Sequence, residues 1–207
     1  MAVFVVVVAA GLAGDLWSKH AVFSALLGDP AVARRVGDLA PGRDAAPSAA
    51  EVLRWLRLHR QVFSGFRLTL STNPGVVFGL PMPPWAVAVA TVFTIALVAY
   101  FFATSGAAGR WTHVALAMVL SGALGNFYDR MIARVRVPGI ETPITGQVRD
   151  FLDFSEIRVL GVNYPYIFNV ADVLLVVGVA MLILHWAVAA RRQRKAQPAA
   201  KAPKRRR

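Results

Sequence analysis

The fold is decided by three blocks of sequence: GALGNFYDR at 122–130, VRDF at 148–151 and YPYIFNVADVLLVV at 164–177. The stretch that contains them places four aspartates beside long uncharged runs: Asp129, Asp150, Asp153 and Asp172. An ionisable group at the edge of a bilayer is costly unless it is paired or functional. The cluster therefore indicates a functional site, with the alternative that these residues only mark where helices leave a membrane.

The composition is typical of a membrane protein. The 207 residues suit a single domain, 57% of them are hydrophobic and only 16% are charged, and the mean hydropathy is +0.53. The chain has no cysteine, which excludes disulfides, a thiolate metal site and a cysteine nucleophile.

The net charge of +12 is concentrated in residues 191–207, which hold nine of the 23 basic residues and no acidic residue. We interpret this tail as a disordered cytoplasmic anchor that sets the membrane topology. The alternative is that it binds anionic lipid or nucleic acid. No nucleic-acid partner is expected for the rest of the chain.

The hydropathy pattern predicts an all-α membrane protein built as a bundle of four transmembrane helices, within one membrane-embedded domain over 1–190. The expected spans are about 1–23, 84–104, 111–131 and 167–190. For the first of them, a cleavable signal peptide is the alternative, but the basic region that begins such a peptide is missing. The basic tail directly after the last span favours cytoplasmic termini.

A long first loop interrupts this pattern. Residues 28–60 are rich in proline and arginine, and we expect them to form an extramembrane insertion. Within and just beyond it, residues 51–61 have the spacing of a short basic amphipathic helix, which would either lie at the headgroup surface or pack on its own domain. Residues 63–70 partly alternate between apolar and polar, as a half-buried strand does. Asn73 and Gly75 belong to a turn ahead of the second span.

The predicted topology gathers the polar residues of all four spans at the outer end of the bundle. Asp15 and Lys19 are four residues apart on one helix face and can neutralise each other, either as a structural ion pair or as a brace for a nearby site. The other members are Asn73 before the second span, Asn126, Asp129 and Arg130 at the end of the third, Asp150 in the following loop, and Asn169 and Asp172 at the start of the fourth.

Two carboxylates held close together cannot both ionise cheaply, so one keeps a proton while the other is a base. Such a pair can activate water against an amide. The four histidines are scattered and none neighbours an acidic pair, so neither a metal nor another cofactor is expected. A serine–lysine mechanism would have to use Lys19, whose neighbour Ser18 points elsewhere on a helix. The residues therefore favour an aspartic mechanism.

Five blocks resemble the lipoprotein signal peptidases (signal peptidase II), which are bacterial membrane aspartic proteases. They are DLWSK at 15–19, TNPGVVFG at 72–79, GALGNFYDR at 122–130, VRDF at 148–151 and FNVADV at 168–173. The resemblance implies a multi-pass protein of the bacterial inner membrane that cleaves a signal peptide just before a diacylglyceryl-modified cysteine. It also implies a small extracytoplasmic β-cradle and an amphipathic helix that rest on the membrane.

The resemblance further implies that Asp150 and Asp172 form the catalytic pair. The residues that it implies bind substrate or support the pair are Asp15, Lys19, Asn73, Gly75, Gly122, Asn126, Asp129, Arg130 and Asn169. Glycines such as Gly122 can equally serve helix packing. Residues 133–147 form a second insertion relative to the family, so Asp153 competes with Asp150, although Val148 and Phe151 reproduce the block around Asp150.

The expected partners are a lipid-modified prolipoprotein and membrane lipids, and the protein is expected to be a monomer. The main alternative is a non-enzymatic membrane transporter or assembly factor that binds a ligand with its charged cluster. A transporter is expected to carry polar groups at mid-span, whereas the central parts of the second and fourth predicted spans are apolar.

Overall fold

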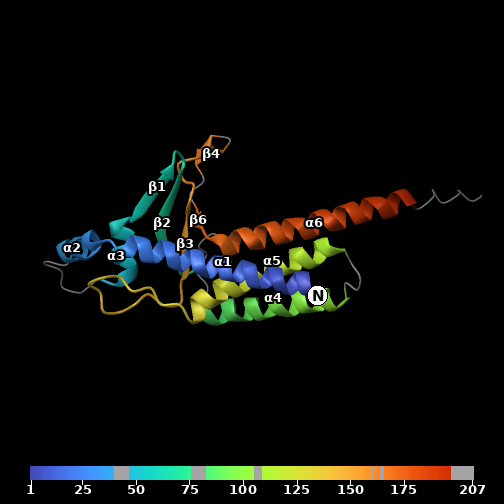
Figure 1. Cartoon of the computed structure of the whole chain (residues 1–207), viewed down its shortest axis with the longest axis horizontal. Coiled ribbons are helices and arrows are strands. Elements are labelled where there is room, and N and C mark those ends of the chain that lie inside the picture. The colour runs from blue at the N-terminus through green and yellow to red at the C-terminus, as the bar shows by residue number, and fades with distance from the viewer. Residues whose placement is uncertain (40–46, 76–82, 105–108, 160, 164–165, 197–207) are drawn as a thin grey trace, which may run out of the picture.

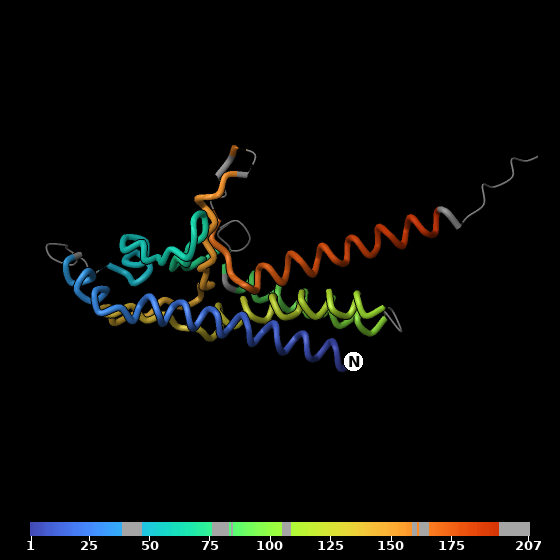
Figure 2. Tube along the Cα trace, turned by 45° about the horizontal axis from the view of Figure 1, so that its top comes forward, coloured from blue at the N-terminus to red at the C-terminus, as the bar shows by residue number. Residues whose placement is uncertain are grey.

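Four long helices form a bundle in the computed structural model, which describes residues 1–39, 47–75, 83–104, 109–159, 161–163 and 166–196. They are α1 (Ala2–Leu27), α4 (Pro84–Thr104), α5 (Arg110–Met131) and α6 (Val170–Ala196). The strands and two short helices lie at one end of the bundle, whereas the N-terminus and the C-terminal end of α6 lie at the other (Figure 1). Figure 2 shows that α6 diverges from the other helices toward that far end.

Helix α5 is the centre of the bundle, because it packs against α1, α4 and α6. Its buried residues extend from Thr112 to Asp129. Within the described residues, α1, α4 and α6 each contain a stretch long and apolar enough to cross a membrane, and α5 is not among them. A helix surrounded by other helices needs no continuous apolar surface toward lipid. The structure is therefore a mostly helical membrane protein with three candidate spans in its described part, where the sequence predicted four.

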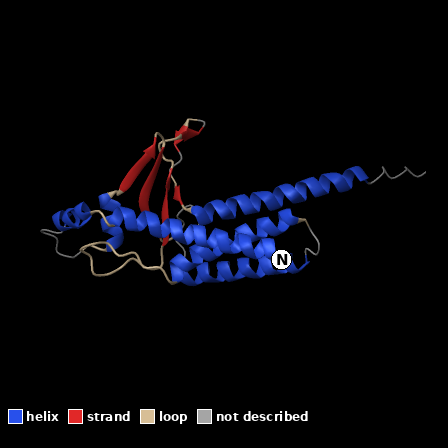
Figure 3. Cartoon of the chain, in the orientation of Figure 1, coloured by secondary structure: helices blue, strands red, loops and turns tan. Residues whose placement is uncertain are grey.

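The strands form a small antiparallel sheet at the end of the bundle (Figure 3). Its order is β1 (His59–Phe63), β2 (Phe66–Asn73), β3 (Val148–Asp153) and β6 (Ile167–Phe168), and a separate hairpin joins β4 (Arg158–Val159) to β5 (Val162–Asn163). Asp150 lies opposite Ser71, and Leu152 lies opposite Phe168. Because α6 follows β6 almost directly, this register brings Asp150 to the start of α6.

The two insertions fold together as one unit, which we call the cap: α2 (Pro30–Leu39), α3 (Ala49–Leu56) and residues 135–144. They share a hydrophobic core with the end of α1 and the sheet; its buried members from the cap are Val32, Val36, Ala49, Val52, Leu53, Leu56, Val135, Val137 and Ile144. Reciprocal backbone hydrogen bonds between Val135 and Ile144 close the second insertion. The cap thus explains how loops that interrupt the membrane pattern remain ordered.

The apolar face of α3 is used inside the cap, which decides between the two interpretations of residues 51–61. Val52, Leu53 and Leu56 are buried, whereas Arg54 is exposed. The helix therefore packs on its own domain. It starts with a capping box between Ser48 and Glu51, which satisfies backbone donors at the helix start.

Several predicted boundaries were wrong. The helix predicted over 51–61 ends at Leu56, because Arg57 adopts a left-handed conformation with φ of 44° and β1 then pairs with β2. The strand predicted over 63–70 is β2, which begins only at Phe66. The fourth long helix begins at Val170, since residues 167 and 168 form β6, and it continues to Ala196 into the basic tail. Helix α2 was not predicted.

Parts of the sequence predictions lie outside the described residues. These parts are residues 40–46 of the first insertion, 76–79 of the second family block, 164–165 of the block at 164–177, and 197–207 of the basic tail.

The shared core of the cap predicts that damage to one insertion spreads to the other. Leu53 on α3 is 2% exposed, so Leu53→Ala should destabilise the cap by about 2–5 kcal/mol. Hydrogen exchange measured by mass spectrometry should then rise in α2 and in residues 135–144 as well as in α3. The matched control is Val62→Ala, at a side chain that is 51% exposed, which should change none of these. A rise confined to α3 would contradict the shared core.

Candidate active site

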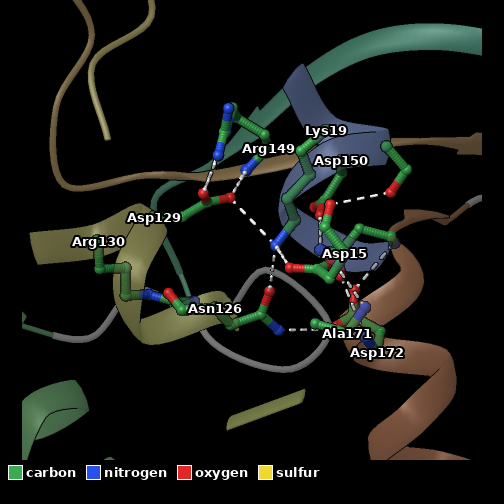
Figure 4. Close-up of polar contacts among 11 residues, drawn as sticks. Asp15, Lys19, Asn126, Asp129, Arg130, Arg149, Asp150, Ala171 and Asp172 are labelled. Atoms are coloured by element: carbon green, nitrogen blue, oxygen red, sulfur yellow. Dashed lines mark hydrogen bonds and ion pairs between the residues drawn. The ribbon is translucent and has the colours of Figure 1, made fainter. Parts of the chain in front are cut away.

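Lys19 lies at the centre of a group of charges sealed from solvent. Its side chain and those of Asp15 and Asp129 are completely buried. The ammonium nitrogen lies 2.8 Å from Asp15 Oδ2 and 3.2 Å from Asp129 Oδ2, and it donates to Asn126 Oδ1 at 3.0 Å (Figure 4). An ammonium group has three protons and no acceptor, so three oxygens satisfy it. The predicted pairing of Asp15 with Lys19 is confirmed.

Asp129 connects these charges to the sheet. Its Oδ1 accepts from Arg149 Nη2 at 2.6 Å and from Nε at 3.0 Å, and its Oδ2 accepts from the backbone N–H of Arg149 at 2.9 Å. Arg149 directly precedes Asp150 in β3, so this contact fixes the position of Asp150 relative to α5. Asp15, Lys19, Asp129 and Arg149 make up what we call the buried ionic cluster. Its two cations and two carboxylates balance, as buried charges require.

The start of α6 is held by two carboxylates. Asp15 Oδ1 accepts from the backbone N–H of Ala171 at 2.8 Å. Asn169 Oδ1 accepts from the backbone N–H of Asp172 at 3.1 Å, while Asp172 Oδ2 accepts from the backbone N–H of Asn169 at 3.2 Å. This reciprocal pattern is that of a capping box, and it satisfies donors that the first turn of a helix leaves unpaired. It holds the Asp172 carboxylate at the helix start.

Asp150 and Asp172 line one cavity of about 440 Å³. Asp150 Oδ1 accepts from Asn169 Nδ2 at 2.6 Å, and Asp172 Oδ1 accepts from Asn126 Nδ2 at 2.8 Å. Asp150 comes from β3 and Asp172 from the first turn of α6 (Figure 4). The cavity also extends between apolar residues of α4 and α6, namely Val87, Ala90, Leu175 and Val176.

The Asp150 carboxyl holds its proton unusually well. Burial raises its pKa and the negative charge of Asp172 raises it further, to about 7, although the amide of Asn169, the charge of Lys19 and the amide of Asn73 act in the opposite direction. A carboxyl group with a pKa near neutrality can donate a proton that an ordinary aspartate has already lost. The cavity therefore combines a carboxyl that can donate a proton with a second carboxyl beside it.

Asp153, the other candidate on β3, belongs to a different network. It accepts from Arg67 Nε at 2.6 Å, Thr69 Oγ1 at 2.8 Å and the backbone N–H of Ser155 at 2.9 Å. Burial alone would raise the pKa of Asp153, but these hydrogen bonds outweigh it and lower the pKa to about 2. Residues three apart on a strand point to opposite faces, and Asp153 is not among the residues that line the cavity. The geometry favours Asp150.

The remaining predicted residues lie around the same cavity. Asn73 and Arg130 line it. Asn73 Oδ1 accepts from the backbone N–H of Gly75, whose carbonyl accepts from Arg130 Nη2 at 2.5 Å. Gly122 faces α6 so closely that an added Cβ would collide with the carbonyl of Ala171 and with Leu175. Its absent side chain therefore lets the helix that carries Asp172 approach α5.

Two features of the site were not predicted from the sequence. The first is Arg149, the main partner of Asp129. The sequence around a strand residue carries no signal of a contact with a helix residue 20 positions earlier. The capping box was readable as a variant of the usual Ser/Thr-x-x-Glu/Gln signature, with Asn169 in the first place and Asp172 in the last. As to metals, no group of three or more His, Asp or Glu side chains among the described residues is arranged to hold an ion.

A profile of the signal peptidase (SPase) II family matches residues 7–188. The chain belongs to this family. Among relatives named lipoprotein signal peptidase, the protein of an Anaeromyxobacter species is 34% identical over 126 residues, 58% of this chain and 54% of that protein. The protein of Desulfitobacterium hafniense is 32% identical over 133 residues, 64% of this chain and 76% of that protein. The chain thus spans about half the length of the first signal peptidase II relative.

Solved structures show the same fold. One bacterial membrane enzyme, determined by the in meso method, superposes with a TM-score of 0.63 at 19% identity and covers 98% of this chain and 95% of its own. A second gives a TM-score of 0.50 at 22% identity, covering 82% and 92%. This signal peptidase II family member is therefore a bacterial membrane protein with several candidate spans.

The close packing around Asp15 predicts a sharp effect of one methyl group. A Cβ added at Gly125 would collide with the Asp15 carboxylate, so Gly125→Ala should cost about 1–3 kcal/mol by overpacking and should lower the melting temperature in detergent. Gly14→Ala is the matched control, because its added Cβ would lie within 4 Å of nothing beyond its chain neighbours and the nearby backbone of its own helix, and alanine is the better helix former. Equal melting temperatures for the two variants would contradict the packing described for Asp15.

Proposed function

We propose that the protein is a membrane aspartic endopeptidase that removes the signal peptide of a diacylglyceryl-modified prolipoprotein just before the lipidated cysteine. The observation that carries this proposal is the pair of Asp150 and Asp172 in one cavity, where Asp150 has a pKa of about 7. Membership of the signal peptidase II family supports the same reaction and substrate.

We infer that α5 is a fourth membrane crossing, within a single membrane-embedded domain over 1–190. Both termini would be cytoplasmic and the aspartate pair would lie near the outer face, with the sheet and cap outside the bilayer. Two observations support this topology. The N-terminus and the end of α6 lie opposite the sheet, and the basic residues from Arg191 onward follow the apolar part of α6, as residues on the cytoplasmic side do.

The cavity offers a route for an apolar signal peptide. Its lining from α4 and α6 is mostly apolar, as at Val87 and Val176, whereas α5 contributes Asn126 and Arg130. An apolar helix could therefore lie between α4 and α6 while its polar end meets the two carboxyl groups. Membrane lipids and the prolipoprotein are the partners that this arrangement requires, and a monomer suffices, since both carboxyl groups come from one chain.

The chemistry is amide hydrolysis by a pair of carboxyl groups that share one proton. The ionised carboxylate takes a proton from a water molecule, and the oxygen of that water attacks the scissile carbonyl carbon. At the same time the protonated carboxyl donates its proton to the carbonyl oxygen. When the C–N bond breaks, one proton passes to the leaving nitrogen and another returns from the diol to the pair. The pair then holds one proton again, so no net acid or base is consumed.

A serine–lysine mechanism fits the contacts less well. All three acceptors that Lys19 can satisfy are already present, and its side chain is fully buried. The hydroxyl of Ser18 donates to the backbone carbonyl of Asp15 at 2.9 Å. Neither group is therefore placed as a nucleophile with its base.

Substitution of the three candidate aspartates tests the proposed function. With purified protein and a lipid-modified prolipoprotein, Asp150→Asn and Asp172→Asn should each lower kcat by at least about 10³-fold, because acid–base catalysis is lost. Asp153→Asn is the control on the same strand and should retain turnover. Activity in Asp150→Asn together with loss of activity in Asp153→Asn would show that Asp153, and not Asp150, is the catalytic residue on β3. Wild-type protein that never cleaves the substrate would overturn the peptidase proposal.

The raised pKa of Asp150 predicts the pH dependence. As the pH rises through about 7, the Asp150 carboxyl loses its proton, so kcat/KM should fall about tenfold for each further pH unit. In Asp153→Asn the fall should occur at the same pH, because Asp153 lies in another network. A rate that stays constant up to pH values well above the pKa would show that no proton on Asp150 is needed.

A further inference from the structure

We propose that a basic cleft between the cap and β1 binds acidic side chains of the substrate, about four to six residues after the lipidated cysteine. These residues belong to the mature segment, the part of the prolipoprotein that follows the cleavage site. The proposal rests on the peptidase function and deepens it, because it adds a determinant of which prolipoproteins are cleaved efficiently. The cleft has a volume of about 750 Å³, and its charged members are Asp29, Arg35, Arg57 and Arg60.

The basic cleft carries positive charge that the described residues do not neutralise. Arg35, Arg57 and Arg60 line it, and none of them forms an ion pair with an acidic side chain in the described part of the chain. Asp29 instead accepts from the backbone N–H of Ala31 at 2.8 Å, at the start of α2. Guanidinium groups bind carboxylates and phosphates through paired N–H donors, so the cleft suits an anionic ligand.

The end of α3 holds two of these arginines in place. Arg35 Nη2 donates to the carbonyl of Leu56, the last residue of α3, at 2.8 Å. Arg57 follows as the C-cap in the left-handed conformation, with φ of 44°. Glycine is favoured at such a position, because a side chain there strains the backbone. Strained residues cluster at functional sites, and the side chain that bears this cost lines the cleft.

The sheet places the cleft within reach of a peptide held at the aspartate pair. Asp150 lies opposite Ser71 on β2. Two residues earlier on β2, Thr69 lies opposite His59 of β1, which also lines the cleft. Because adjacent strands lie about 4.8 Å apart and a strand rises about 3.4 Å per residue, His59 lies about 12 Å from Asp150. An extended chain covers this distance with about four residues.

The strand that leads away from the cleft favours a peptide as the ligand. β1 is at the edge of the four-stranded sheet, and all five of its residues are exposed. The edge of a sheet presents backbone N–H and C=O groups to which an extended peptide can add as a further strand. Such pairing is independent of sequence, so the arginines would supply the preference for acidic side chains.

A lipid headgroup suits the cleft less well. Asp15 binds the start of α6 and therefore marks the outer end of the apolar part of that helix. Ala25, which lines the cleft, follows Asp15 by ten residues of α1, so it lies about 15 Å farther out along the helix axis. The headgroup layer is only about 5–8 Å thick. A phosphate at its surface would not reach the cleft.

Three prolipoproteins that differ only in the fourth to sixth residues after the lipidated cysteine test the proposal. These positions carry aspartates, asparagines or lysines. With full-length protein in phosphatidylcholine nanodiscs, kcat/KM should be about 3- to 10-fold higher for the aspartate substrate than for the asparagine substrate, mainly through KM, and lowest for the lysine substrate. An increase in salt from about 50 to about 500 mM should reduce these differences, because exposed charges are screened.

Three variants test the part played by the arginines. Arg57→Gly relieves the left-handed strain, so it should not lower the melting temperature, whereas the preference for the aspartate substrate should fall about 2- to 3-fold. The double variant Arg57→Glu with Arg60→Glu should invert the preference, so that the lysine substrate is cleaved faster. Arg54→Glu is the matched control, because Arg54 is an exposed residue of α3 that does not line the cleft, and it should keep the wild-type preference.

The outcomes separate the proposal from the function on which it rests. Equal kcat/KM for all three substrates, or an unchanged preference in the double variant, would overturn the role of the cleft and leave the peptidase function standing. Binding to Asp172→Asn protein needs no cleavage, and its Kd should still be lower for the aspartate substrate than for the asparagine substrate. If this difference appears but the wild type cleaves nothing, the peptidase function alone fails.

A phosphate site is the competing outcome. Inorganic phosphate would then protect residues 57–60 from hydrogen exchange in the wild type but not in Arg57→Gly, while the three substrates would be cleaved alike. That combination would replace the peptide by a phosphate ligand and overturn the proposal.

Discussion

A fully buried lysine ammonium group is the constraint on which this structure depends. Removing such a charge from water costs several kcal/mol unless oxygens replace the lost water. The three oxygens around Lys19 come from Asp15 on its own helix and from Asn126 and Asp129 on α5. The two carboxylates continue the connection, because Asp15 Oδ1 accepts from Ala171 of α6 and both oxygens of Asp129 accept from Arg149 of β3. A single ammonium group therefore relates four elements to one another.

The two aspartates that line the cavity lie on the two elements located in this way. Asp150 directly follows Arg149, whose backbone N–H donates to Asp129. Asp172 directly follows Ala171, whose backbone N–H donates to Asp15. Neither depends only on its own sequence neighbours for its place. The tight contacts made by Gly122 and Gly125 complete the arrangement, because any larger side chain would push α5 away from α6 or from Asp15.

Much of this could be predicted from local patterns. Apolar runs located the four long helices, and the spacing of four residues identified the Asp15–Lys19 pair. The features that could not be predicted depend on residues distant in the sequence. The pairing of β1 with β2 sets the end of α3, and the contact with Asp129 sets the role of Arg149. The choice between Asp150 and Asp153 needed the strand itself, because its two faces lead to a cavity and to Arg67 respectively.

The cap has a consequence for how such a chain changes over time. Its two insertions lie far apart in the sequence but bury their apolar side chains against each other, so that Gly139 of the second lies against Val36 of the first. Either one alone would leave an apolar face uncovered. They are therefore expected to be gained or lost together among relatives, to show correlated substitutions at facing positions, and to be transferable to another family member only as a pair.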